Sequence, residues 1–260
     1  MSAERRLDRR GFLARGLAAA STTLLGGCEE LSDQAWVKRI LDSGETLTRI
    51  TQEALLSPQA LAREYGAADL SRAFRANGST DPDDPIYVAH AKTGFADWKL
   101  SVGGLVEAPL ELSLAELRAL PSRTQITRHD CVEGWSCIGK WKGVKLSGLL
   151  ERARLKPSAR YIVFYCADTL GSTGTEADLY YESIGLADAF HAQTILAYEM
   201  NDQTLPVPHG APLRLRVERQ LGYKMAKYVM RVEAVDSLAS IRGGRGGFWE
   251  DLGYEWYAGI

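Results

Sequence analysis

The sequence has 260 residues, of which 45% are hydrophobic, and a formal net charge of −2 at pH 7. A chain of this length and composition can bury one sizeable core with a smaller appendage. The near-neutral charge argues against a nucleic acid or an acidic membrane surface as partner, and four cysteines are too few for a disulfide-dense scaffold.

The N-terminus has the pattern of a secretory signal. An arginine pair, Arg9 and Arg10, precedes a short apolar run over residues 17–25 and two glycines before Cys28. The pair resembles the bacterial twin-arginine signal, and residues 25–28 resemble a lipobox, with simple cleavage and no lipid as the alternative. No apolar run is long enough to span a membrane. We predict a signal over residues 1–28, export to the periplasm and a lipid anchor at Cys28.

Residues 29–85 are expected to form a helical extension and a linker. Trp36, Val37 and Ile40 recur at helical spacing. Ser57 followed by proline is typical of a helix N-terminus, which predicts a helix over residues 59–65. The Asn, Gly, Ser, Asp and Pro residues of 77–85 are typical of a linker.

The main domain is predicted to begin near residue 86 and to mix short strands with short helices. Ser113 and Glu116 form a capping box before one helix, and Ser147 is expected to cap a second over residues 148–154. Strands are predicted over residues 98–102, 161–165, 213–217 and 228–235. This pattern predicts a mixed α+β fold with a mainly antiparallel sheet.

The stretch over residues 127–141 sets Cys131 between an apparent strand and a glycine-broken loop. Arg128, Lys140 and Lys142 bring positive charge, which favours the thiolate that binds a metal or attacks an electrophile. A buried structural cysteine is the alternative, because free cysteine is among the most buried residue types.

The segment over residues 205–227 offers groups that suit a phosphate and a flat ring. Prolines and a glycine hold a loop at His209, and Arg214 begins an alternating strand. Arginine supplies a planar fork for phosphate, while Lys227 and loop amides supply further donors. A solvated charged strand is the alternative interpretation for Arg214 or Lys227 alone.

Two motifs carry a family resemblance. Cys-Val-Glu-Gly-Trp-Ser at 131–136, followed by Trp-Lys-Gly-Val at 141–144, resembles the molybdenum-cysteine segment of the sulfite oxidase superfamily. It is most similar to the branch of the periplasmic protein-methionine-sulfoxide reductase catalytic subunit. The segment over 205–214 with Gly-x-Lys-x-x-Lys at 222–227 resembles the family's pterin-phosphate segment. Glycine and tryptophan follow Cys131 where true sulfite oxidases are expected to have Asn-Arg, which favours a neutral substrate over sulfite.

The resemblance implies a compact molybdopterin-binding domain and roles for particular residues. Cys131 is implied to ligate molybdenum beside the two dithiolene sulfurs of a pyranopterin. The residues implied at the cofactor are His90, Lys92, Cys131, Cys166, His209, Arg214, Met225, Ala226 and Lys227. The residues implied on the catalytic, substrate side are Cys131, Trp135, Tyr254 and Tyr257. A surface-loop histidine is the alternative for His90, and Cys137 and Cys166 are expected to be unpaired.

The sequence therefore predicts an exported oxidoreductase with a molybdenum-molybdopterin cofactor. The predicted parts are residues 1–28 (signal), 29–85 (extension and linker), 86–240 (molybdopterin domain) and 241–260 (glycine-rich, aromatic tail near the active site). We expect oxygen-atom transfer, with reduction of a neutral S-oxide or N-oxide in a small molecule or a protein.

No haem or iron–sulfur cluster is expected, because there is no Cys-x-x-Cys-His motif and no second cysteine cluster. Electrons would come from an external donor, a membrane haem protein or a cytochrome. Three alternatives stay open: sulfite-oxidase-like oxidation, a cofactor-free binding lipoprotein, and a hydrolase in which Cys131 works with His129 or His209.

Overall fold

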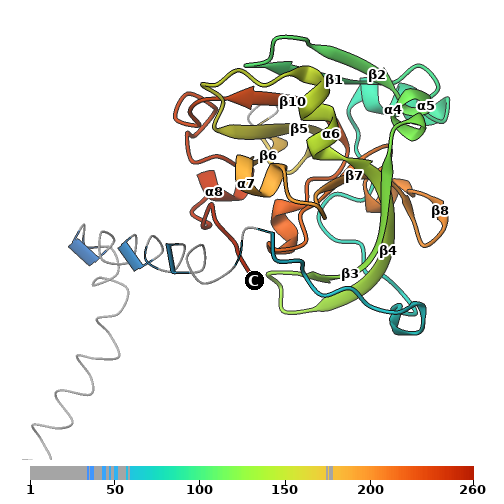
Figure 1. Cartoon of the computed structure of the whole chain (residues 1–260), viewed down its shortest axis with the longest axis horizontal. Helices are drawn as coiled ribbons and strands as arrows, with labels where there is room; N and C mark the ends of the chain where they lie inside the picture. Colours follow the sequence, from blue (N-terminus) through green and yellow to red (C-terminus); the bar gives the residue numbers. More distant parts are fainter. Residues whose placement is uncertain are drawn as a thin grey trace, which may run out of the picture. The chain divides into compact units, whose positions relative to one another are not determined.

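The structure is a computed structural model that describes residues 59–173, 175 and 178–260, together with isolated positions between 34 and 57. The sheets, the named helices and the pocket lie in a compact unit that runs from residue 56 to the C-terminus (Figure 1). The predicted signal over 1–28, with Cys28, lies outside the described residues. Most of the predicted helical extension does too, although isolated positions 36, 37, 43, 44, 47, 50 and 51 are helical.

Within the described residues, two five-stranded sheets make up the fold (Figure 1). The first has the order β2-β1-β10-β5-β6, and the second has β3-β4-β7-β8 with β9 beside β7. Strands β1 and β10 are parallel and the other pairs are antiparallel. The strands are β1 (Lys99–Gly104), β2 (Leu110–Ser113), β3 (Ser122–Asp130), β4 (Ser136–Lys145), β5 (Tyr161–Thr169), β6 (Leu179–Gly185), β7 (Ile195–Met200), β8 (Gln203–Thr204), β9 (Arg214–Arg216) and β10 (Val229–Val235). The predicted α+β class is confirmed.

Short helices connect the strands: α4 (Pro85–Lys92), α5 (Leu114–Ala119), α6 (Leu146–Ala153), α7 (Leu186–Ala189) and α8 (Phe248–Asp251), with 3-10 turns η1 (Ala67–Asp69), η3 (Val207–His209) and η4 (Gly222–Lys224). The predicted capping box of α5 is confirmed. Glu116 N donates to Ser113 Oγ at 3.3 Å, and Ser113 N donates to the Glu116 carboxylate at 2.8 Å. No helix of the described part is long and apolar enough to cross a membrane.

Helix α6 begins two residues earlier than the Ser147 cap predicted. Its N-cap is Lys145, directly after β4, and no side chain caps it. The helix instead buries Leu146, Leu149 and Leu150 in the core that it shares with the first sheet. Burying this apolar face contributes about 25 cal/mol of stabilisation per Å² of surface removed from water. This contribution, and not a capping hydrogen bond, determines where the helix begins.

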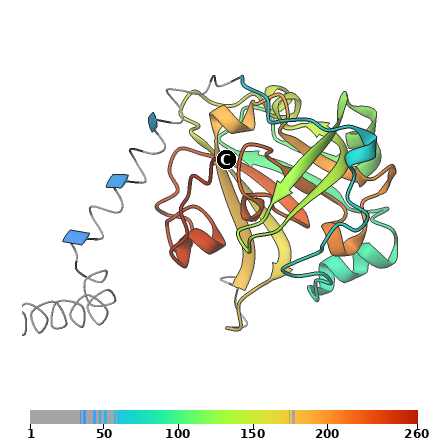
Figure 2. The ribbon, with the colours of Figure 1, turned by 90° about the horizontal axis from the view of Figure 1, so that it is seen from below.

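The predicted helix over residues 59–65 is wrong. No described residue of this stretch is helical: residue 59 lies in a turn, Glu64 forms an isolated β-bridge with Thr127, and the backbone is hydrogen-bonded to parts of the chain that are distant in sequence. Ala62 N donates to Gln193 Oε1 at 2.8 Å, and Tyr65 N donates to Ile126 O at 2.9 Å. The blue-green segment that follows runs beside the β3–β4 hairpin (Figure 1, Figure 2). Tertiary hydrogen bonds here override a local signal of modest strength.

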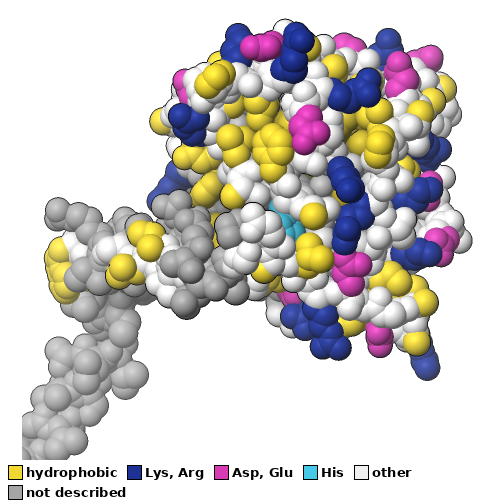
Figure 3. All heavy atoms as spheres, viewed as in Figure 1, with side chains coloured by type: hydrophobic (Ala, Val, Ile, Leu, Met, Phe, Trp, Pro, Cys, Tyr) yellow, Lys and Arg dark blue, Asp and Glu magenta, His cyan; other side chains and the backbone are white. Residues whose placement is uncertain are grey.

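The alternating strand around β9 does not have a solvated face. Arg214, Arg216 and Glu218 are 4%, 0% and 3% exposed. Strand β9 pairs with β7, and the Arg216 guanidinium pairs with Glu218 inside the protein at 2.6 Å. The solvated-strand interpretation of Arg214 is therefore wrong. On the face shown in Figure 3, other basic side chains are interspersed with acidic ones.

The end of β1 generates a test of the fold. Gly104 has φ +77° beside β10, and a Cβ there would lie 2.3 Å from Ala234 O, whereas a Cβ on Gly103 would meet nothing within 4 Å. Gly104→Ala should lower the free energy of unfolding by roughly 1–3 kcal/mol. The matched change Gly103→Ala should shift it by less than about 0.5 kcal/mol. Denaturant unfolding measures both, and equal losses would contradict the parallel β1–β10 packing.

Candidate functional site

Cys131 lies in the tight turn that joins β3 to β4. Its backbone N–H donates to Trp135 O at 2.9 Å, and Gly134 N donates to Cys131 O at 3.0 Å. Gly134 has φ +84°, a left-handed conformation that favours glycine. This turn holds the thiol at the end of the hairpin with 8% of the residue exposed.

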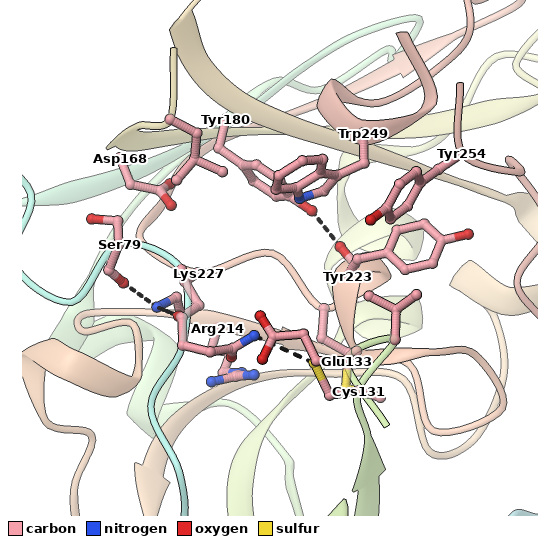
Figure 4. A pocket seen from close by; sticks show the side chains of 16 residues that line it. Ser79, Cys131, Glu133, Asp168, Tyr180, Arg214, Tyr223, Lys227, Trp249 and Tyr254 are labelled. Carbon is pink, nitrogen blue, oxygen red and sulfur yellow. Dashed lines mark hydrogen bonds between the residues drawn. The ribbon is translucent and has the colours of Figure 1, made fainter. Parts of the chain in front are cut away.

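The thiol lines a pocket with two unlike sides (Figure 4). The polar side carries Cys131, Glu133, Arg214 and Lys227. The aromatic side carries Tyr180, Tyr223, Trp249 and Tyr254, which we call the aromatic wall. Asp168 and Ser79 lie across the pocket from Cys131 in Figure 4. Cys131 comes from the second sheet, while Asp168 and Tyr180 come from β5 and β6 of the first, so the pocket forms where the two sheets meet.

The aromatic wall is held by ring contacts. Trp249 and Tyr254 stack with centroids 5.4 Å apart, and Tyr223 meets Tyr254 edge-on at 5.4 Å. The Tyr180 hydroxyl donates to Tyr223 O, and the Tyr223 hydroxyl donates to Glu255 O at 2.6 Å. These contacts keep a broad apolar surface opposite the thiol.

Two cations next to the pocket are neutralised by carboxylates. Arg216 pairs with Glu218 at 2.6 Å, and Lys224 lies 2.5 Å from both Glu182 and Glu250. All of these side chains have 0% exposure. Buried charges of this kind persist only when they are paired.

Two further cations, the buried Arg214 and the partly buried Lys227, line the pocket without a carboxylate partner. No described carboxylate lies within ion-pair distance of Arg214 or Lys227. Arg214 Nη1 donates to His209 O at 3.1 Å, and its Nε has no partner. Lys227 Nζ donates to backbone oxygens only, among them Asn77 O at 2.8 Å and Ser79 O.

The electrostatics of these cations favour an anionic ligand. Burial, with Arg216 nearby, lowers the pKa of Arg214 to about 9. Burial and Arg214 lower the pKa of Lys227 to about 8, against an opposing effect of Asp168. Burial raises the pKa of Asp168 to about 7, although Lys227 opposes the shift. An anion beside Arg214 and Lys227 would supply the counter-charge that the described residues lack.

The Cys131 thiol is less acidic than the nearby cations predicted. Burial raises its pKa, and the Glu133 backbone N–H and the amide of Asn77, whose Nδ2 donates to Sγ at 3.4 Å, only partly oppose this. Arg128 and Lys140 pair with neighbouring carboxylates instead, at 2.9 and 2.6 Å. A metal at Cys131 would have to displace the thiol proton, as coordinated metals do.

Histidine does not complete a nucleophile at Cys131. Burial, with Arg214 and Arg216, lowers the pKa of His129 well below its ordinary value. Its Nδ1 lies 3.2 Å from Met225 Sδ and 3.2 Å from an Arg216 nitrogen. Among the described residues no histidine is hydrogen-bonded to the Cys131 thiol, so none of them is placed as its general base.

The structure brings part of the sequence-derived set to the pocket. The set members that line it are Cys131, Arg214, Met225, Lys227 and Tyr254. Those that do not line it are His90, Lys92, Trp135, Cys166, His209, Ala226 and Tyr257. The roles proposed for this second group stay predictions.

Most residues of the second group lie close to the pocket in sequence or space. His209 lies 5.7 Å from the Phe74 ring, and burial lowers its pKa to about 4. Trp135 donates from Nε1 to Glu133 at 2.9 Å. Cys166 is buried on β5 two residues before Asp168, whereas His90 lies in α4. The thiols of Cys131, Cys137 and Cys166 are free, as expected.

Sequence reasoning missed several residues that line the pocket. Asn77 and Ser79 lie in a stretch whose composition is typical of a linker. Lys227 nevertheless donates to the backbone oxygens of both, and the Asn77 amide donates to Cys131 Sγ. Asp168 carried a usable signal, because a carboxylate at the end of an apolar strand is costly to bury without a role. Tyr180 and Tyr223 gave no local signal, since tyrosine at strand spacing is usually core.

Similar proteins are known for most of the chain. Residues 87–240 match the family described as "Oxidoreductase molybdopterin binding domain". The chain is 37% identical over 251 residues to the "Putative protein-methionine-sulfoxide reductase subunit YedZ1" of Azospira oryzae, covering 96% of this chain and 87% of that protein. It is 36% identical over 163 residues to "Protein-methionine-sulfoxide reductase catalytic subunit MsrP" of Ralstonia nicotianae, covering 60% of this chain and 49% of that protein.

A solved structure is also similar. The sulfane dehydrogenase SoxCD from Paracoccus pantotrophus matches with a TM-score of 0.50 and 25% identity, over 57% of this chain and 40% of that chain. The chain therefore spans about half the length of the Ralstonia relative and less than half of the SoxCD chain.

Proposed function

The chain belongs to the oxidoreductase molybdopterin-binding domain family, and from this premise we propose that it is the catalytic subunit of an exported reductase of neutral sulfoxides. Membership makes it a molybdopterin-dependent oxidoreductase and confirms the resemblance carried by residues 131–144. The observation that carries the proposal is one pocket that combines the Cys131 sulfur, two cations without a carboxylate partner and the aromatic wall (Figure 4).

The chemistry of the pocket fits the cofactor that the family implies. No described group of three or more His, Cys, Asp or Glu residues could hold a metal, so the chain offers molybdenum the single sulfur of Cys131. The remaining ligands would be the two sulfurs of the pterin, and soft sulfur ligands suit such a centre. Arg214 and Lys227 are the groups we assign to the pterin phosphate, because each lacks an anionic partner.

When bound, the cofactor supplies transfer of an oxygen atom with two electrons. The residues of the chain bind, orient and shield. Asn77 would orient the ligating sulfur through its amide donor. Asp168, with its buried Oδ1 unpartnered, can accept a hydrogen bond from a ring N–H of a ligand. The aromatic wall would exclude water from the side on which the substrate approaches.

Two features of the pocket favour a neutral substrate. The wall opposite Cys131 is apolar, and the Glu133 carboxylate lies beside the thiol. If Arg214 and Lys227 hold the pterin phosphate, no pocket-lining cation among the described residues is left for a dianion such as sulfite. The names of two relatives, both protein-methionine-sulfoxide reductases, support a sulfoxide substrate.

The charged side chains of the tail and of the strand before Cys131 do not line the pocket. Glu250 is buried and pairs with Lys224 at 2.5 Å. Arg128 and Arg245 do not line the pocket, and Arg128 pairs with Asp130. The preference for a neutral substrate therefore rests on the aromatic wall and on Glu133.

Electrons and location belong to the same proposal. The relatives are named as subunits, which supports an external partner as electron donor, such as a membrane haem protein or a cytochrome. The arginine pair at Arg9 and Arg10 supports export of the folded, cofactor-loaded chain to the periplasm, with a lipid anchor at Cys28.

Replacement of the proposed metal ligand tests the site. Cys131→Ser should lower bound molybdenum, measured by elemental analysis, and should lower turnover by more than about 100-fold, beyond what outer-shell changes cause. Serine keeps the size of the side chain but is a harder, far less acidic ligand. The control is Cys137→Ser, a thiol in β4 that does not line the pocket, which should keep both metal and activity. Full metal content and activity in Cys131→Ser would refute the ligand assignment.

Substrate charge is tested by steady-state kinetics on molybdenum-loaded protein. Dimethyl sulfoxide and methionine sulfoxide should be reduced with reduced viologen as donor. Sulfite oxidation should have a kcat/KM at least about tenfold lower, because desolvating an anion without a paired cation costs more than about 1.4 kcal/mol. Efficient sulfite oxidation without any S-oxide or N-oxide reduction would establish the sulfite-oxidase-like alternative. Loaded protein that is inert to all of them would point to a binding protein.

Export is tested by changing the arginine pair. Arg9→Lys with Arg10→Lys should retain the protein in the cytoplasm, since the receptor reads paired guanidinium groups and not charge alone. Cell fractionation with immunoblotting gives the result. The control, Arg5→Lys with Arg6→Lys, changes an upstream pair and should leave export intact. Unchanged export of the first variant would point to the general secretory route and count against cofactor loading before transport.

A further inference from the structure

Three ionisable side chains without solvent exposure lie behind the aromatic wall. Lys224 Nζ lies 2.5 Å from Glu182 Oε1 and 2.5 Å from Glu250 Oε1, and all three side chains are 0% exposed. We call Glu182, Lys224 and Glu250 the buried triad; they come from β6, η4 and α8. Gly247 packs directly against the buried triad, because a Cβ at this position would lie 2.0 Å from Glu250 Oε2 and 2.9 Å from Glu182 Oε1.

The charges of the buried triad do not balance unless it holds a proton. Two carboxylates and one ammonium sum to −1, and an uncompensated charge in the interior is costly. Among the described residues, Lys224 is the single cation within ion-pair distance of either carboxylate. One proton shared by Glu182 and Glu250 makes the triad neutral. Burial raises the pKa of Glu182 well above its ordinary value, aided by Glu250 and opposed by Lys224.

Other ionisable groups near Glu182 do not supply the missing positive charge. Cys166 on β5 and Tyr180 on β6 are both fully buried, and burial raises the pKa of each, so both are neutral. The Tyr181 hydroxyl donates to Asp251 at 2.5 Å, and the Arg242 guanidinium lies over the Tyr181 ring, 4.7 Å from the ring centroid.

Each member of the buried triad is linked to the aromatic wall. Tyr223 precedes Lys224 and Trp249 precedes Glu250 in the chain. Tyr180 Oη lies 3.4 Å from Glu182 Oε2. The Tyr180 hydroxyl donates to Tyr223 O (Figure 4), so its oxygen is free to accept from a protonated Glu182 carboxyl. Tyr180 thus stands between a buried proton and the pocket that it lines.

We propose that the buried triad is a proton store for the pocket and that Tyr180 passes the triad's proton to the substrate oxygen. This step rests on the proposed sulfoxide reduction. The balanced reaction is R2SO + 2H⁺ + 2e⁻ → R2S + H2O, in which the S–O bond breaks and both electrons come from an external donor such as reduced viologen. Glu182 gives its proton to Tyr180 Oη as Tyr180 gives its own to the departing oxygen. The second proton comes from solvent, and Tyr180 returns a solvent proton to Glu182 after product release.

Infrared spectroscopy tests the store without relying on activity. Molybdenum-loaded protein at pH 7 should show the carbonyl stretch of a protonated, buried carboxylic acid that is distinct from any band of Asp168, which an Asp168→Asn variant identifies. Glu182→Gln should abolish the band, because Glu250 and Lys224 then form a neutral pair without a proton. Tyr180→Phe should keep the band, since the buried triad is untouched. Absence of the band in the unaltered protein, or its persistence in Glu182→Gln, would overturn the proposal.

Kinetics with dimethyl sulfoxide and reduced viologen test the delivery. Glu182→Gln and Tyr180→Phe should each lower kcat by about 100-fold with little change in KM, the size of a lost general acid. Imidazolium buffer should partly restore the rate of Tyr180→Phe in proportion to its concentration, which a packing defect would not allow. Tyr181→Phe, which removes a buried hydroxyl on the Asp251 side, is the control and should keep kcat.

The two proposals fail in different ways. Sulfoxide turnover by the unaltered protein, with full kcat in Tyr180→Phe and Glu182→Gln, would overturn proton delivery and leave the proposed function intact. An unaltered protein that reduces no sulfoxide would overturn the proposed function and the delivery step together. If Glu182→Gln does not fold, Tyr180→Phe still decides, because it keeps the buried triad and removes only the hydroxyl between it and the pocket.

Discussion

The burial of Arg214, Arg216 and Lys224, with Lys227 partly buried nearby, is the constraint on which the rest of the site depends. An isolated buried charge costs several kcal/mol, so each cation needs a partner. Arg216 and Lys224 find carboxylates inside the chain. Arg214 and Lys227 find only backbone oxygens. The first two belong to the frame of the domain, and the other two leave positive charge at the pocket for a bound anion.

The position of the pocket follows from the meeting of two sheets. The β3–β4 hairpin of the second sheet carries Cys131 at its turn, while β5 and β6 of the first sheet carry Asp168 and Tyr180. The Cys131 sulfur, the two cations without a carboxylate partner and the aromatic wall therefore come from separate parts of the fold. Because Cys131 ends a hairpin of the second sheet and Asp168 and Tyr180 lie on strands of the first, a ligand held between them contacts rigid elements, as precise chemistry requires.

The segment that carries the two pocket-lining cations also carries Lys224 of the buried triad, the proposed proton store. Lys224 neutralises part of the buried triad, and Lys227, three residues later, faces the pocket. Lys224 is the last residue of the 3-10 turn η4, whereas Lys227 lies beyond the turn, so the two side chains meet different surroundings. Lys224 has carboxylate partners, which is typical of a cation that stabilises the fold. Lys227 has backbone oxygens only, and this is the reason we assign it to a bound anion.

The sequence by itself determined the local features: the strands with alternating or apolar runs, the Ser113 capping box, the glycine-broken turn after Cys131 and the motifs that resemble the family. These depend on residues a few positions apart. Only the tertiary structure decided that Arg214 is buried without a counter-ion and that Asn77 reaches the Cys131 sulfur, 54 residues away. It also decided that Lys224 pairs with Glu182, 42 residues away. Periodicity reports which face of an element is apolar. It does not report which charges meet across sheets, because that depends on how the elements pack.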